Sequence, residues 1–144
     1  WAGPLSLYAA TKGAYAYAID PDPEAYQSLI KNLKLNSALT EKIKPQNIAI
    51  SNTNGESVLY AREQYGNSST SLLHRIRDEI STETTKTYRL DDFLKINPIK
   101  KIDLMKVDIE GGEFEIIDQL EKAKKEKQRE NQEKVFTTFD FQKI

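Results

Sequence analysis

The 144-residue sequence predicts one α/β domain with a largely parallel sheet. Three observations support this fold class. Helical and strand-like patterns alternate along most of the chain, one uncharged apolar run suits a strand covered on both faces, and the length suits one domain with one core. Right-handed crossovers would place the carboxyl ends of such strands at one edge of the sheet. Ligands of open α/β sheets bind at that edge, so residues that follow the strands are the candidates for function.

The first third of the chain alternates between helix and strand. Pro4 suits the first turn of a helix that ends at Gly13, and the uncharged run 14–19 predicts a buried strand. Asp22 is expected to cap the next helix, which Asn36 ends. The amphipathic positions of that helix are Tyr26, Leu29, Ile30 and Leu33.

A hairpin is predicted in the middle of the chain. Residues 47–51 and 57–60 read as two strands, and Asn54 and Gly55 between them are a strong signal for a tight turn. The polar, irregular stretch 62–81 then predicts a long loop, and long loops often carry function.

A strand, a helix and a second strand are expected next. Residues 85–90 predict a strand, Asp91 is expected to cap a short helix, and 102–107 predict a further strand. The helix after it should turn one face to the core. That face consists of Phe114, Ile117 and Leu120, widened by Ile116.

The end of the chain changes character. Ten of the fourteen residues in 121–134 are charged, which predicts a solvated helix extension or a loop. Residues 135–141 predict a last strand.

Composition excludes several classes of protein. The 21 basic and 22 acidic residues give a net charge of −1, so nothing attracts the chain to nucleic acid or to an anionic membrane. Without cysteine there is no disulfide framework and no thiolate chemistry. Without an apolar run of about 18 residues or a signal-peptide pattern, we expect a cytoplasmic protein.

A group of carboxylates marks the end of the strand at 102–107. Asp108, Glu110 and Glu113 could favour the start of the following helix by about 0.3–1 kcal/mol each, bind a hard cation, or position and deprotonate a substrate. We assign Glu113 to the helix terminus and Asp108 to a site. A metal fits least, because no histidine joins the cluster in sequence.

A second candidate lies at the end of the strand 14–19. The Asp20 carboxylate there can accept hydrogen bonds from both hydroxyls of a ribose. Gly3 precedes it by seventeen residues, close to the ~20 residues expected between a cofactor-binding turn and its ribose acid. The alternative is that Asp20 only shapes the turn before Pro21.

Several segments, in this order, resemble the FkbM-type S-adenosylmethionine-dependent methyltransferases, over roughly residues 1–120. The segments are Trp1–Ala10, Tyr17–Pro23, Asn47–Gly55, Ser57–Tyr60, Asn67–Leu72, Tyr88–Phe93 and Leu104–Glu113. The last of them, Lys106-Val-Asp-Ile-Glu-Gly-Gly-Glu113 at its core, is fairly specific in this context.

The resemblance implies a Rossmann-like sheet with helices on both faces, and methyl transfer from S-adenosylmethionine to an oxygen of a sugar or small metabolite. Carried over by position, Gly3 borders the methionine part of the cofactor and Asp20 binds its ribose. The strand end Asn47–Ala49 lies near adenine. Asp108 and Glu110 lie near the transferred methyl group and the acceptor, and no metal is expected.

The resemblance also predicts that the chain is a fragment. The first strand of the family and the start of its glycine loop should precede Trp1, and closing strands should follow Phe141. We therefore expect a single, incomplete methyltransferase-like domain over 1–144, in which 121–134 is the charged extension.

Two other functions stay open. A dinucleotide-binding oxidoreductase domain would share Gly3 and Asp20 and would not need the carboxylate motif at 108–113. A non-catalytic module that keeps only the fold is the second alternative.

Overall fold

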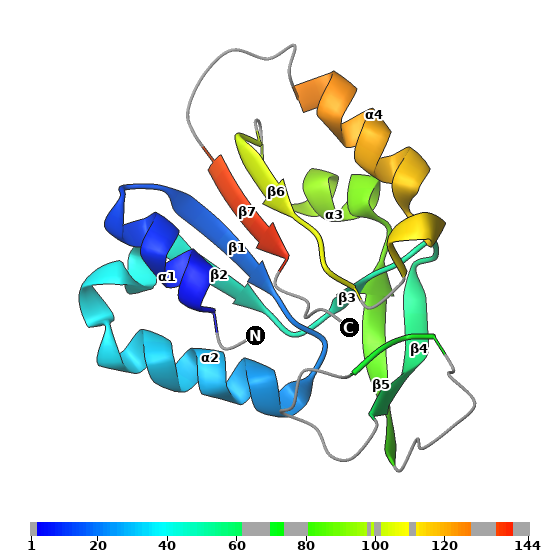
Figure 1. The fold of residues 1–144 in the computed structure, drawn as a ribbon, viewed down its shortest axis with the longest axis horizontal. Helices are drawn as coiled ribbons and strands as arrows, with labels where there is room; N and C mark the ends of the chain where they lie inside the picture. The colour runs from blue at the N-terminus through cyan, green and yellow to red at the C-terminus, as the bar shows by residue number, and fades with distance from the viewer. Residues whose placement is uncertain are drawn as a thin grey trace.

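A computed structural model of the protein describes residues 3–61, 70–73, 81–97, 99, 102–109, 112–127 and 135–139 (Figure 1). Helices and strands alternate, as predicted, except in the middle of the chain, where four strands follow one another. In chain order they are α1 (Pro4–Thr11), β1 (Tyr15–Ile19), α2 (Pro23–Leu35), the 3₁₀-helix η1 (Ser37–Lys42), β2 (Ile43–Gln46), β3 (Ala49–Ile50), β4 (Gly55–Ala61), β5 (Ser81–Tyr88), α3 (Leu90–Ile96), β6 (Leu104–Lys106), the 3₁₀-helix η2 (Gly112–Glu115), α4 (Ile117–Lys127) and β7 (Val135–Phe139). No helix in these ranges is long and apolar enough to cross a membrane.

The larger sheet has the strand order β2-β1-β7-β6, and all of its pairs are parallel. Ile19 at the end of β1 pairs with Gln46 at the end of β2 and with Phe139 at the end of β7. The carboxyl ends of these strands therefore lie together at one edge, and Figure 1 shows the arrowheads of β1, β2 and β7 pointing the same way. The prediction of a mostly parallel sheet is confirmed.

Helices cover both faces of this sheet, as expected. Along β1, Ala16 and Ala18 pack into a cluster with residues of α1 and α2, whereas Tyr17 and Ile19 belong to a cluster with residues of α3 and α4. Successive side chains of a strand point to opposite faces, so an uncharged strand buries both. The Tyr17 ring packs edge-on against Phe93 of α3, with 6.0 Å between the ring centroids.

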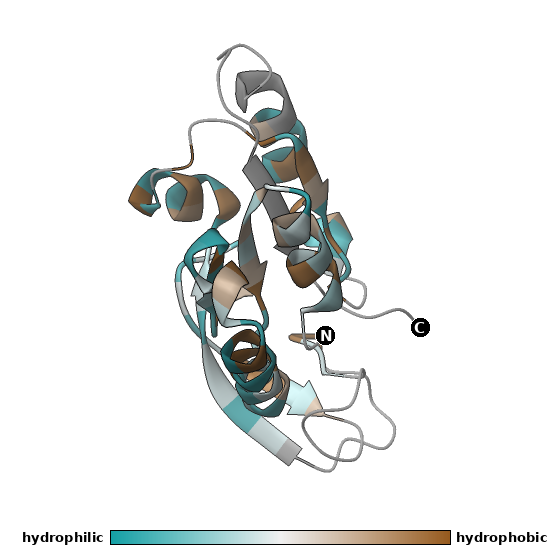
Figure 2. Ribbon diagram, turned by 90° about the vertical axis from the view of Figure 1, so that its left-hand side faces the viewer, coloured by the Kyte–Doolittle hydropathy of each residue, from teal (hydrophilic) through white to brown (hydrophobic). Residues whose placement is uncertain are grey.

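The start of α2 follows the prediction from its capping residue. Asp22 Oδ1 accepts hydrogen bonds from the backbone N–H groups of Glu24 (2.8 Å) and Ala25 (3.0 Å), and Asn36 is the C-cap. Figure 2 views α2 nearly end-on and shows hydrophobic and hydrophilic residues on different parts of its circumference. The buried residues of this helix are Ala25, Leu29 and Leu33.

The predicted hairpin is wrong in its pairing. In the second, three-stranded sheet the order is β3-β5-β4, so β5 lies between the two strands that were expected to pair. Asn54 does not sit at the tip of a hairpin between β3 and β4. Its Oδ1 accepts a hydrogen bond from Arg89 N (2.7 Å), and its Nδ2 donates one to Asp92 (2.7 Å). These two bonds connect the turn to the start of α3. The antiparallel pair is β4 with β5, whose connection is long.

No sequence pattern indicated β2, because Lys44 and Pro45 are not typical of a strand. β2 is the edge of its sheet, where a proline without an N–H can be tolerated. The predicted cap of α3 is also wrong. Arg89 is the N-cap, and Asp91 lies inside the first turn, where it accepts from Arg89 Nε at 3.2 Å.

The predicted buried face of the helix after β6 needs correction. Phe114 is 83% exposed and Ile117 49% exposed, while Ile116 is 1% exposed and Ala123 is buried. The segment begins as the 3₁₀-helix η2 and becomes α-helical only at Ile117, which changes the angular phase of the side chains. The charged extension is helical to Lys127, and residues 128–134 lie outside the described part.

Candidate active site

The predicted cofactor residues Asp20 and Asn47 lie together at the carboxyl edge of the parallel sheet. Asp20 directly follows β1, and Asn47 directly follows the neighbouring strand β2. Asn47 Nδ2 donates to the carbonyl oxygens of Asp20 (2.9 Å) and Pro21 (3.1 Å). The Asn47 side chain thereby fixes the backbone that carries the Asp20 carboxylate.

The Asp20 side chain is nearly buried and takes part in the turn that leads to α2. Its Oδ1 accepts a hydrogen bond from Asp22 N at 3.0 Å. Asp20 therefore does shape this turn, which is the role that the sequence offered as the alternative to ribose binding. This bond orients the carboxylate, and a carboxylate can accept more than one hydrogen bond.

Gly3 stands at the N-cap of α1 with φ +69° and ψ +27°, a left-handed conformation that favours glycine. A Cβ at this position would collide with Leu29 Cδ1 of α2. Glycine therefore allows the start of α1 to approach α2 closely. In Figure 1 this end of α1 points to the same side as the carboxyl end of β1.

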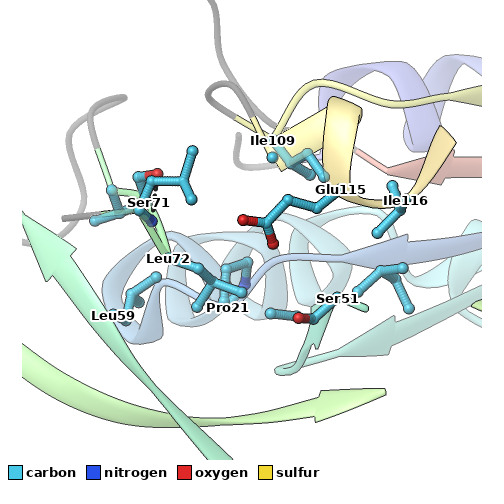
Figure 3. A pocket seen from close by; sticks show the side chains of 13 residues that line it. Pro21, Ser51, Leu59, Ser71, Leu72, Ile109, Glu115 and Ile116 are labelled. Atoms are coloured by element: carbon cyan, nitrogen blue, oxygen red, sulfur yellow. Dashed lines mark hydrogen bonds between the residues drawn. The ribbon is translucent and has the colours of Figure 1, made fainter. Parts of the chain in front are cut away.

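A small cavity, here called the Glu115 cavity, lies between the two sheets beside the predicted site residues (Figure 3). Its volume is about 30 Å³. The wall includes Ala49 itself, Pro21 next to Asp20, and Ile109 next to Asp108. The predicted cofactor edge and the predicted acceptor edge therefore meet at one cavity.

A larger cavity, here called the Asn47 cavity, borders the first and has a volume of about 280 Å³. Both walls include Pro21 and Leu59. Asn47 and the start of α2 form one side, and residues of β5 with Glu83 and Lys86 form the other. Gly3, Asp20 and Asp108 are not among the described residues that line either cavity.

The carboxylates after β6 have different surroundings. Asp108 follows β6 by two residues, and its Oδ2 forms an ion pair with Lys106 Nζ at 3.3 Å. Glu113 Oε1 accepts a hydrogen bond from Ile109 N at 2.6 Å. Glu113 therefore closes the turn between β6 and η2, in keeping with the structural role expected of it.

Glu110, the second predicted catalytic residue, lies outside the described residues. Within the described part, no group of three His, Cys, Asp or Glu side chains is arranged to hold a metal ion.

Glu115 is a candidate that the sequence reasoning missed. It ends η2 and lines the small cavity, and Figure 3 shows its carboxylate directed toward the space between Ser71 and Ser51. The sequence carried a weak signal, since Glu115 lies only two residues beyond the carboxylate motif. Its orientation depends on the 3₁₀ turn, which no periodicity indicated.

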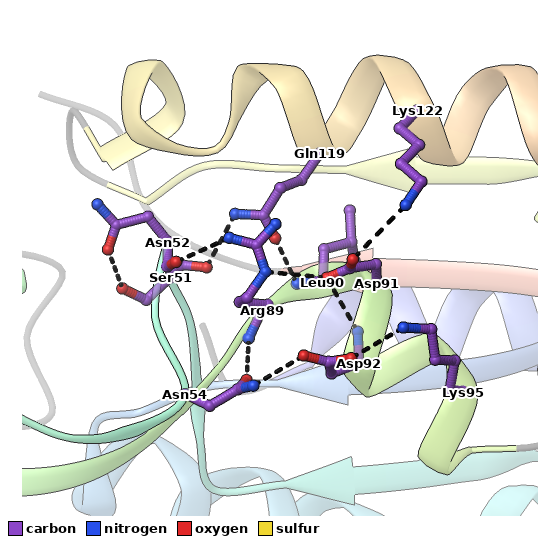
Figure 4. Close-up of polar contacts among 10 residues, drawn as sticks. All are labelled: Ser51, Asn52, Asn54, Arg89, Leu90, Asp91, Asp92, Lys95, Gln119 and Lys122. Atoms are coloured by element: carbon purple, nitrogen blue, oxygen red, sulfur yellow. Dashed lines mark hydrogen bonds and ion pairs between the residues drawn. The ribbon is translucent and has the colours of Figure 1, made fainter.

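A polar network supports the wall of this site from behind (Figure 4). Gln119 of α4 is buried and bridges the backbone of Leu90 (2.7 Å) and Ser51 (3.1 Å). The network continues to Asn54 and Asp92. The hydrogen bond from Asn54, and secondly the hydrogen bond from Lys95, lower the pKa of the Asp92 carboxyl below its ordinary value.

Comparison with protein-family models matched residues 3–142 to the methyltransferase FkbM domain. Comparison with curated proteins and with solved structures found no match. The match includes every described element of the fold and all of the predicted site residues, Glu110 among them. The chain therefore belongs to the FkbM methyltransferase family, and this membership supports a methyltransferase function.

Proposed function

We propose that this domain is an S-adenosylmethionine-dependent O-methyltransferase that methylates a hydroxyl group of a sugar or small metabolite. The observation that carries the proposal is the pair of adjoining cavities at the carboxyl edge of the parallel strands. One is bordered by Asn47 and the other by Ala49 and Ile109. A ligand at such an edge agrees with the binding rule for open α/β sheets.

The residues present fit the nucleoside part of the cofactor. Asp20 is a nearly buried carboxylate held in place by the N–H of Asp22, and it can accept hydrogen bonds from ribose hydroxyls. The Asn47 cavity, at about 280 Å³, is close to the lower limit of cavities that hold drug-sized ligands, about 300 Å³. The strand end Asn47–Ala49 and the left-handed Gly3 would border the rest of the molecule.

When bound, S-adenosylmethionine supplies a methyl group activated by the sulfonium sulfur. The contribution of the chain is alignment, because holding two reactants in line is worth several kcal/mol of the barrier. Asp108 or Glu110 is proposed to take the proton of the acceptor hydroxyl, which is a weak nucleophile without a base. Lys106, paired with Asp108, would fix the position of that carboxylate.

Calorimetric titration of the full chain with S-adenosylmethionine and, separately, with NAD tests this proposal. We expect binding of S-adenosylmethionine and none of NAD. Binding of NAD alone would establish the dinucleotide-binding oxidoreductase instead. Binding of neither would leave the non-catalytic module as the better description.

The base can be tested in the same protein with Asp108→Asn. This variant should lower the turnover of methyl transfer more than the affinity for S-adenosylmethionine, since a positioned base typically contributes ~10²–10⁴ in rate. Turnover equal to that of the wild type would exclude Asp108 as the base.

A further inference from the structure

The wall of the Glu115 cavity combines apolar side chains with one carboxylate, a combination suited to a selective subsite. Most of its described wall is apolar, with side chains such as Leu59, Leu72, Ile109 and Ile116. Of the described residues that line it, Glu115 alone carries a charge. Figure 3 shows the carboxylate directed toward the space that the apolar side chains line, while Glu115 as a residue is exposed to solvent.

Two other polar side chains of the wall, Ser71 and Ser51, have local partners. Ser71 Oγ accepts from Leu73 N at 3.1 Å, and Ser51 Oγ donates to Asn52 at 3.4 Å. The carboxylate of Glu113, two residues away, accepts a hydrogen bond from Ile109 N. Glu115 makes no hydrogen bond or ion pair in the described part of the chain, so its carboxylate is available to a ligand.

The volume limits what can enter. About 30 Å³ exceeds the ~10–15 Å³ needed by one water molecule and is far below the ~300 Å³ of a complete ligand site. A small aliphatic end of a larger molecule fits such a space. A carboxylate at its side favours a neighbouring hydrogen-bond donor and disfavours a neighbouring negative charge.

We propose that the Glu115 cavity is an acceptor subsite that takes a hydroxyl or ammonium group attached to a small aliphatic group and rejects anionic acceptors, with Glu115 as the specificity-determining residue. The inference rests on the proposed function for its meaning, because it names the class of acceptor. Glu115 is distinct from Asp108, which lies outside the described wall of this cavity.

Three probes with the same alkyl group test the proposal: isobutylammonium, 2-methylpropan-1-ol and 3-methylbutanoate. Their binding is followed through the methyl NMR signals of Ile109 and Ile116 in the full chain. We expect isobutylammonium to bind about threefold to tenfold tighter than 3-methylbutanoate, because a partly solvated charge gives only a modest effect. The neutral alcohol should fall between them.

Glu115→Gln should bring the ammonium and carboxylate affinities close to each other without abolishing alkyl binding. Asp118→Asn is the matched control, since it removes a negative charge from an exposed residue one turn further along that does not line the cavity. This control should keep the preference.

Equal affinities in the wild type, a preference that survives in Glu115→Gln, or no shift of the cavity signals with any probe would overturn the proposal. The titration with S-adenosylmethionine is independent of these probes. A preference for the ammonium probe in a protein that does not bind S-adenosylmethionine would uphold the subsite and refute the methyltransferase proposal.

Discussion

Gln119 of α4 accepts a hydrogen bond from the backbone N–H of Leu90 at 2.7 Å and so joins the helix after the carboxylate motif to the start of α3. The other end of the same amide donates to the carbonyl of Ser51 at 3.1 Å, just beyond β3 (Figure 4). One buried side chain thus holds together three segments. Ser51 and the residues before α4 also line the Glu115 cavity, so this bridge sets the spacing of its wall.

Gln119→Leu should destabilise the fold by roughly 2–4 kcal/mol. The substitution leaves the N–H of Leu90 and the carbonyl of Ser51 without their partner in a place where Gln119 itself is only 7% exposed. Urea denaturation measures the free energy of unfolding. Gln27→Leu on the exposed side of α2 is the control and should change it by less than about 0.5 kcal/mol. Similar values for the two variants would show that the bridge contributes little.

Gly3→Ala should destabilise the protein more than Gly13→Ala. Both glycines have positive φ, +69° and +90°, so alanine strains either backbone by about 1–2 kcal/mol. Only at Gly3 would the new Cβ also collide with Leu29, which adds about 1–3 kcal/mol of overpacking. Thermal denaturation of the two variants gives the comparison. If the close approach is real, Gly3→Ala combined with Leu29→Ala will destabilise less than the sum of the single changes.

Thr87→Val should leave stability unchanged or raise it by about 1 kcal/mol. Thr87 is 1% exposed, and its hydroxyl has no hydrogen-bond partner among the described residues, so no bond within this part of the fold compensates the desolvation of that group. Thr84→Val, at an exposed position of the same strand, controls for strand propensity. A clear loss of stability in Thr87→Val, measured by urea denaturation, would mean that the buried hydroxyl has a partner such as an ordered water.

Asp92 should make stability depend on acid pH. Its pKa in the folded protein lies below the ordinary 3.8, chiefly through Asn54 and then through Lys95. The stabilisation is therefore complete above pH 3.8 and is lost as the pH falls through the folded pKa. NMR titration of the Asp92 side chain should show its pKa rising in Asn54→Ala, and rising less in Lys95→Met. An unchanged value in Asn54→Ala would contradict the assigned cause.

Much of the fold could be predicted where local chemistry decides the structure. Asp22 caps α2 through two short hydrogen bonds, and the uncharged β1 buries both of its faces. These features depend on neighbours in sequence. The pairing of β4 depended on β5, which begins twenty residues after β4 ends, and the Asn54-Gly55 turn signal indicated the wrong partner.

The candidate site was predictable only where local sequence determines the position of a residue. Asp20 could be predicted from the end of its own strand. Asn47 was assigned only through the resemblance to the family, because the strand β2 that brings it beside Asp20 was not predicted. The orientation of Glu115 follows from the 3₁₀ turn of η2, and Gln119 acts through contacts with distant backbone. Neither feature has a signature in local sequence.

The affinity of Asp20→Asn for S-adenosylmethionine tests the central claim, that the carboxyl edge at Asp20 holds the cofactor. Asparagine keeps an oxygen that can accept from Asp22 N, so the turn and the thermal stability should be retained. It removes the charge and one acceptor for the ribose. We predict that calorimetric titration will give a dissociation constant about tenfold to hundredfold larger than that of the wild type. Equal affinity of the two proteins would contradict the claim.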